Sequence, residues 1–141
     1  MNSIKNFEVV FLQEGDAHIA ICRDLGIVDQ GKTQESASIN LKKTTQIYLQ
    51  EANLNITANL LGTEGLTFTP LSLPQVSPCK LITVLERLEF RRSSHCVVLK
   101  KQSQGGEVIC TVPLRYPLAS ATIWNLLYFA GISCQEFFDT L

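Results

Sequence analysis

The stretch Gly26-Ile27-Val28-Asp29-Gln30-Gly31-Lys32-Thr33 decides how the first half of this 141-residue chain folds. Its first five residues read as a short strand. Thr33 is a good N-cap, because its hydroxyl can accept from the free amides of a following helical turn. The spacing after Thr33 predicts one amphipathic helix of about five turns. The residues that recur at this helical spacing are Ala37, Leu41, Thr44 or Thr45, Tyr48 and Ala52.

Two strand-like runs before this stretch predict a hairpin. They extend from Phe7 to Leu12 and from Ala17 to Cys22, and Glu14-Gly15-Asp16 separates them as a turn. After the helix, Leu66-Thr67-Phe68-Thr69 alternates and predicts a fourth strand. We therefore expect the order β-β-β-α-β, with three or four strands in one sheet and one helix.

Prolines separate this half from the rest of the chain. Pro70, Pro74 and Pro78 fall close together, and proline stiffens the chain and disfavours helix in the residue before it. We predict a linker over residues 70–77. Ser77-Pro78 is typical of an N-cap and a first-turn proline, so a second helix should begin there. Its expected core stripe is Leu81, Val84, Leu85 and Leu88.

A second hairpin is expected after this helix. Strands from His95 to Lys101 and from Glu107 to Val112 are joined by Gln104-Gly105-Gly106, and a further short strand could follow them. We expect a three-stranded antiparallel sheet with helices on one face.

Two helices should close the chain. One begins at Ser120 or Thr122 and has Gly131 as its C′ residue, and Ser133-Cys134-Gln135-Glu136 is a capping box for the last. Aromatic side chains bury large areas, so we expect those of the first helix in the core or between the two halves. They are Trp124, Tyr128 and Phe129. The predicted fold class is α+β, with small domains at 1–69 and 78–141.

Composition excludes several classes of protein. Apolar content is ordinary, and no apolar run is long enough to cross a bilayer. The N-terminus lacks a basic segment followed by an apolar one, so no signal peptide is expected. Five scattered cysteines without C-x-x-C spacing argue against a disulfide framework and a zinc site, so we expect reduced thiols, no metal, no cofactor and a cytoplasmic location. Residues 1–55 hold five Lys/Arg against seven Asp/Glu, and residues 76–141 hold seven against five. A mildly acidic half could therefore pair with a mildly basic one.

The segment most informative about function is Phe90-Arg91-Arg92-Ser93-Ser94-His95, which is followed by Lys100-Lys101. Cations can hold phosphate, and an imidazole near its working pKa can move a proton. The pattern is therefore compatible with phosphodiester chemistry. A polar surface or core histidine beside a solvated basic face explains the same residues without catalysis.

The first half resembles the N-terminal domain of HicB-type antitoxins over about residues 5–55. The matching features are the opening hairpin, the stretch from Asp24 to Thr33, and the helix with Ala37, Asn40-Leu41 and Tyr48-Leu49. In that family the strand ends in Gln-Gly-Asp-Thr and the helix starts with a Glu-Ala pair. Here Lys32 replaces the Asp and Ser36 replaces the Glu.

The second half, residues 78–141, resembles HicA-type toxins, which are small RNA-binding or mRNA-cleaving proteins with a double-stranded-RNA-binding-like fold. Four features of that family have counterparts here, namely its Gly-Phe pair, Gly-Ser-His, Val-Pro and Ala-Gly-Ile. The counterparts are Glu89-Phe90, Ser93-Ser94-His95, Val112-Pro113 and Ala130-Gly131-Ile132. Glu89 and Ser93 each replace a glycine of that pattern, and Arg115 stands where a second histidine is common.

Together the two resemblances imply a toxin–antitoxin fusion in which the first half masks an RNA-binding half. His95 would act as acid or base in a metal-independent endoribonuclease, a hydrolase of mRNA. The residues expected to contact RNA are Arg91, Arg92, Ser94, Lys100, Lys101 and Arg115. The halves could pair within one chain or between chains, and a homo-oligomer is expected, since small sheets leave edges to cover.

Two other functions remain open from the sequence. The chain could be a catalytically inactive fusion that serves as an interaction or oligomerisation module, because a permanently tethered inhibitor would seldom release its partner. DNA binding is a weaker hypothesis, because the HicA-like half occupies the place of the usual DNA-reading segment. No membrane partner is expected.

Overall fold

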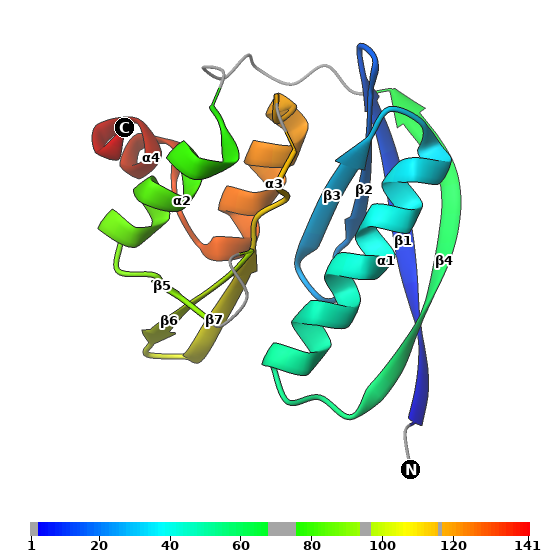
Figure 1. The fold of residues 1–141 in the computed structure, drawn as a ribbon, viewed down its shortest axis with the longest axis horizontal. Helices are drawn as coiled ribbons and strands as arrows, with labels where there is room; N and C mark the ends of the chain where they lie inside the picture. The colour runs from blue at the N-terminus through cyan, green and yellow to red at the C-terminus, as the bar shows by residue number, and fades with distance from the viewer. Residues whose placement is uncertain (1–2, 68–75, 94–96, 116) are drawn as a thin grey trace.

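The computed structural model describes residues 3–67, 76–93, 97–115 and 117–141. In the described residues, four helices and two sheets confirm the α+β class (Figure 1). The first group of elements is β1 (Ser3–Glu14), β2 (Ala17–Cys22), β3 (Ile27–Gly31), α1 (Gln34–Glu51) and β4 (Ile56–Thr67). The second group is α2 (Pro78–Arg87), β5 (Arg91–Arg92), β6 (Val98–Ser103), β7 (Gly106–Thr111), α3 (Ser120–Ala130) and α4 (Cys134–Thr140).

The first sheet has the strand order β3-β2-β1-β4. Its hairpin pairs β1 with β2 as expected, while β4 runs parallel to β1. The strand predicted at residues 66–69 starts much earlier, at Ile56, and Phe68 and Thr69 lie outside the described residues. Pairing with the long β1 supports this extended β4, whose Asn59 and Gly62 are poor strand formers by themselves.

Helix α1 confirms the prediction made from Thr33. The Thr33 and Ser36 side chains form a reciprocal capping box at its start. Gly31 is needed there because a Cβ atom at this position would lie 2.6 Å from the Ala37 amide nitrogen. One face of α1 is buried against β3 and β2, at Ala37, Leu41, Thr45 and Leu49.

The second sheet is antiparallel with the order β5-β6-β7. The expected hairpin is present. Its first strand, β6, begins at Val98, since Val97 lies in a turn, and residues 94–96 of the predicted strand lie outside the described part of the chain. The third strand is Arg91–Arg92, which comes before the hairpin rather than after it. Its two residues pair with Lys100 and Leu99.

Helices α2 and α4 begin at the predicted caps, Ser77 and Ser133. Gly131 ends α3 in the left-handed conformation, as expected. Leu81, Val84 and Leu85 are buried, and Leu88 packs against the same core. The expected burial of the α3 aromatic residues is wrong for Tyr128, which is 79% exposed, whereas Trp124 and Phe129 are partly buried.

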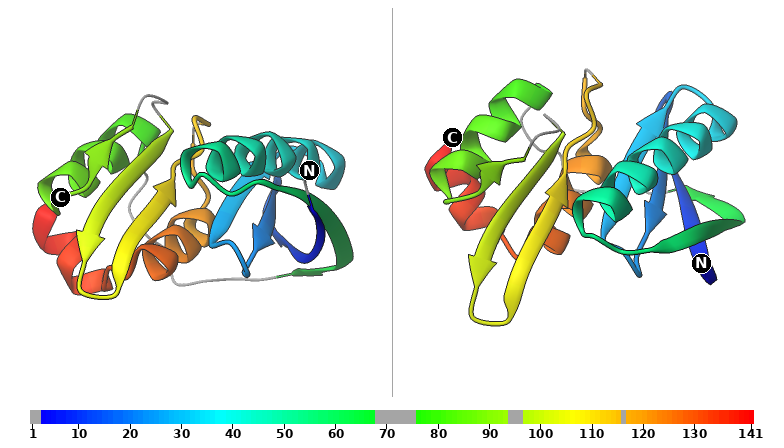
Figure 2. Two further views of the ribbon diagram at one scale, coloured as in Figure 1. Left: turned by 90° about the horizontal axis from the view of Figure 1, so that it is seen from below. Right: turned by 60° about the horizontal axis from the view of Figure 1, so that its bottom comes forward.

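One core connects the two sheets. It contains Ile19, Ile21 and Val28 from the first sheet and Ile123 and Leu126 from α3. Figure 2 shows α3 lying between the sheets, with the other two C-terminal helices beyond it. Fully burying a Leu or Ile is worth about 1.5–3 kcal/mol each, so this core holds the halves together. The division into 1–69, 70–77 and 78–141 stays a prediction.

No helix in the described residues is long and apolar enough to span a membrane.

Candidate nucleic-acid interface

A groove of about 760 Å³ lies where α2 ends and β5 pairs with β6. Four of the predicted RNA-contacting residues line it, namely Arg91, Arg92, Lys100 and Lys101. Because Arg91 lies opposite Lys100 in the antiparallel pair, the short β5 concentrates positive charge next to β6. Three carboxyl side chains share the groove, those of Glu86, Glu89 and Glu107.

The turn that leads into the groove holds Glu89 in an unusual backbone conformation. Its φ is +76°, in the left-handed region that favours glycine. The Glu89 amide donates to the Glu86 carbonyl at 3.1 Å, and the Phe90 amide donates to the Leu85 carbonyl at 3.0 Å. These two bonds form a Schellman motif that ends α2 and directs the chain into β5.

Two cations of the groove are held by neighbours within the C-terminal half. Arg92 binds both carboxylate oxygens of Glu86, through Nε at 3.1 Å and Nη2 at 3.0 Å. The Lys101 Nζ atom lies 5.6 Å from the centroid of the Phe90 ring. Phe90 is buried, so the ring supports Lys101 by a cation–π contact and is not open to a base. The groove thus presents charge rather than a stacking surface.

Lys100 is bound by the other half of the chain. Its Nζ donates to the Glu51 main-chain carbonyl at 2.9 Å and lies 3.3 Å from the Glu51 carboxylate. Glu51 is the last residue of α1, where the helix dipole is negative, so both contacts favour a cation. The N-terminal half therefore neutralises one of the groove's lysines.

Arg115 lies apart from the groove and pairs with the N-terminal half. Its Nε atom is 3.3 Å from Oδ1 of Asp29, whose side chain is almost fully buried. Burial raises the pKa of the Asp29 carboxyl, although hydrogen bonds from the Thr44 hydroxyl and the Gln30 amide, together with Arg115, act in the opposite direction. Arg115 lines a different cavity, of about 520 Å³, between the two halves.

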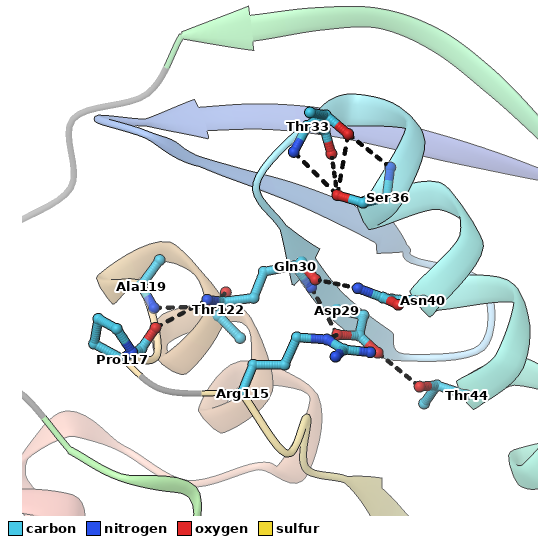
Figure 3. Close-up of polar contacts among 10 residues, drawn as sticks. All are labelled: Asp29, Gln30, Thr33, Ser36, Asn40, Thr44, Arg115, Pro117, Ala119 and Thr122. Carbon is cyan, nitrogen blue, oxygen red and sulfur yellow. Dashed lines mark hydrogen bonds and ion pairs between the residues drawn. The ribbon is translucent and has the colours of Figure 1, made fainter.

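Next to this ion pair, the Gln30 side chain joins the halves (Figure 3). It donates to the Pro117 carbonyl at 2.9 Å and accepts from the Ala119 amide at 2.9 Å and from the Thr122 hydroxyl at 2.7 Å. Asn40 of α1 donates to the Gln30 carbonyl at 2.9 Å. One glutamine thus connects β3 to both α1 and the start of α3.

Glu14 completes the cap of α3, which has no side-chain cap of its own. Its carboxylate accepts from the Ser120 amide at 2.9 Å and the Ala121 amide at 3.2 Å. A carboxylate satisfies the free amides and the positive end of the helix dipole. Sequence reasoning did not identify Glu14 or Gln30 as contacts, because their partners lie about a hundred positions away along the chain.

The predicted catalytic residue His95 and the predicted RNA contact Ser94 lie outside the described residues. Ser93, directly before them, lines the groove, and its amide donates to the Val98 carbonyl at 2.9 Å. Among the described residues, no group of three or more His, Cys, Asp or Glu could hold a metal ion. Burial raises the pKa of the Cys110 thiol to about 12, so this cysteine stays protonated.

No protein-family model, curated protein or solved structure matches this chain.

Proposed function

We propose that the chain is a cytoplasmic RNA-binding protein of the toxin–antitoxin type, whose C-terminal half holds an RNA backbone and whose N-terminal half restrains it. The observation that carries the proposal is the groove with Arg91, Arg92, Lys100 and Lys101 on two adjoining strands. Such a cluster suits a phosphate backbone, which supplies most of the affinity of proteins that do not read sequence.

The backbone at Glu89 supports the resemblance to HicA-type toxins. That family has glycine in its Gly-Phe pair, and Glu89 precedes Phe90 with φ at +76°. A non-glycine residue in this conformation costs about 1–2 kcal/mol, so the chain keeps a turn that would suit glycine better.

Restraint by the N-terminal half is supported by the two ion pairs between the halves. Lys100 is bound by Glu51, and Arg115 by Asp29. RNA phosphates would have to replace Glu51 to use Lys100 fully. The proposed catalytic step remains that implied by the resemblance, with His95 moving a proton while the groove cations offset negative charge at phosphorus.

A catalytically inactive interaction module is the second candidate function. It is favoured by the common core and by the capping of α3 from the other half, which make release of one half costly. In this case the groove would be a solvated basic face.

The deciding experiment is binding of a fluorescently labelled RNA hairpin by the full chain at low salt, followed by anisotropy. Arg91→Ala/Lys101→Ala should weaken binding about tenfold or more, since each phosphate contact contributes on the order of 1 kcal/mol. Lys42→Ala/Lys43→Ala, on the exposed face of α1, is the matched control and should bind like the unaltered chain. If the unaltered chain binds no RNA, the interaction module is the better account.

Cleavage is tested separately, by incubating the same RNA with the full chain and with His95→Ala in the presence of EDTA. Loss of cleavage in His95→Ala with unchanged RNA binding supports the catalytic role. Equal cleavage by both chains would remove His95 from the mechanism.

A further inference from the structure

Strand β4 has an outer edge that no described residue pairs with. It is the last strand in the order β3-β2-β1-β4 and bonds only to β1. At the opposite edge, β3 is joined to the C-terminal half through Gln30. In the second sheet β5 has only two residues, and β7 packs against α1 and α3. Strand β4 is therefore the long open edge of the described structure.

The part of this edge before the bulge lacks the features that usually prevent pairing. Natural edge strands are protected by charged side chains, prolines, bulges or short length. Residues 56–62 contain no charged residue and no proline. A bulge comes only after them, where Val9 pairs with Gly62 but Phe11 pairs with Gly65.

The side chains along this segment are also compatible with a partner. Leu61 is 49% exposed and Leu54, just before the strand, is 45% exposed. Leu60 packs on the core beneath α1, so Leu61 points to the other face of the sheet. The segment offers main-chain donors and acceptors together with apolar side chains.

We propose that β4 is the self-association surface of this protein, pairing antiparallel with β4 of a second copy over residues 56–62. A second copy can bond to the unpaired main-chain amides and carbonyls of this edge, because two antiparallel strands related by a two-fold axis present the same groups to each other. An uncharged segment brings no like charges together when it pairs with itself. The two first sheets then become one continuous sheet.

The arrangement leaves the basic groove accessible in each copy. In Figure 1, β4 lies at one side of the molecule and β5, β6 and β7 lie at the other. The two grooves would therefore lie at opposite ends of the dimer. The pairing itself does not depend on RNA binding and is tested without RNA.

The test is the molar mass of the full chain in solution, by light scattering after size exclusion at micromolar concentration. The unaltered chain should give twice the 15.7 kDa of one copy, and Leu61→Lys should give a single copy because two added lysines would face the same interface. Tyr128→Lys, at a residue 79% exposed on α3, is the control and should remain a dimer. A monomeric unaltered chain, or a Leu61→Lys variant that stays dimeric, would overturn the proposal.

Hydrogen exchange provides a second measurement that needs no variant. Amides in residues 56–62 should exchange more slowly as the concentration of the unaltered chain rises, because pairing protects the outer edge. Exchange that is independent of concentration in this segment would also overturn the proposal.

Discussion

Asp29 and Arg115 form an ion pair between the two halves of the chain, with Oδ1 and Nε 3.3 Å apart. The Asp29 side chain is 2% exposed and that of Arg115 is 42% exposed, so the carboxylate bears most of the desolvation cost. Oδ2 of Asp29 accepts from the Thr44 hydroxyl at 2.7 Å, and Oδ1 accepts from the main-chain amide of Gln30 at 2.8 Å. This carboxylate thus connects β3, α1 and the C-terminal half.

Asp29→Asn should change how stability depends on pH. Because burial raises the pKa of Asp29 above its ordinary value, the folded chain holds this proton more tightly than the unfolded chain. At low pH the proton on Asp29 therefore increases the free energy of unfolding. This increase is lost as the pH rises through the pKa that Asp29 has in the folded chain. The asparagine side chain stays neutral at every pH. As the pH rises through that pKa, the stability of Asp29→Asn should therefore increase relative to the unaltered chain.

The measurement is urea unfolding from acid to neutral pH, followed by the fluorescence of the single tryptophan, Trp124. A constant difference between Asp29→Asn and the unaltered chain across this pH range would contradict the account.

Gln30→Ala should destabilise the whole chain by about 2–4 kcal/mol, because buried groups that lose a hydrogen-bond partner cost about 1–3 kcal/mol each. The buried groups affected are the Ala119 amide and the Thr122 hydroxyl, and the part-buried bond to the Pro117 carbonyl is lost as well. The exposed Gln46→Ala should stay within about 0.5 kcal/mol in the same unfolding experiment. Equal stabilities of the two variants would show that Gln30 does not hold the halves together.

Glu89→Gly should stabilise the chain by about 1 kcal/mol, because glycine adopts the left-handed conformation without the steric cost of a Cβ atom. Glu89→Ala removes the same carboxylate but keeps the Cβ atom, so it should give no comparable gain. Thermal unfolding of both variants separates the backbone effect from the charge effect. A gain of the same size in Glu89→Ala would assign the effect to charge instead.

Glu51→Gln should strengthen RNA binding about two- to tenfold, because it weakens a partly buried ion pair worth on the order of 1 kcal/mol and frees Lys100 for phosphate. Glu35→Gln, in the first turn of the same helix, makes the same change of charge far from the groove. It should bind RNA like the unaltered chain. Identical affinities for Glu51→Gln and Glu35→Gln would show that α1 does not restrain the groove.

Local patterns in the sequence predicted most of the elements. Thr33, Ser77 and Ser133 begin helices where they were expected, since a capping side chain acts within its own turn. The start of α3 was uncertain between Ser120 and Thr122, because its cap comes from Glu14 and Gln30 on distant strands. A local sequence pattern does not identify a capping residue that lies so far away along the chain.

Longer-range features were harder to predict for the same reason. Strand β4 depends on its pairing with β1, and the two-residue β5 depends on its pairing with β6. Four of the cations that the sequence singled out as RNA contacts line one groove, and their contact with RNA stays a prediction. The sequence did not separate Arg115 from them, because the partner of Arg115 is the buried Asp29.

The central claim is tested most directly by the salt dependence of RNA binding by the full chain. If the groove contacts phosphates, the logarithm of the binding constant should fall linearly with the logarithm of salt concentration, and Arg91→Ala/Lys101→Ala should reduce the slope by about 2. The Lys42→Ala/Lys43→Ala control should keep the slope of the unaltered chain. The same slope in all three proteins, or no RNA binding by the unaltered chain, would contradict the assignment of this groove to RNA.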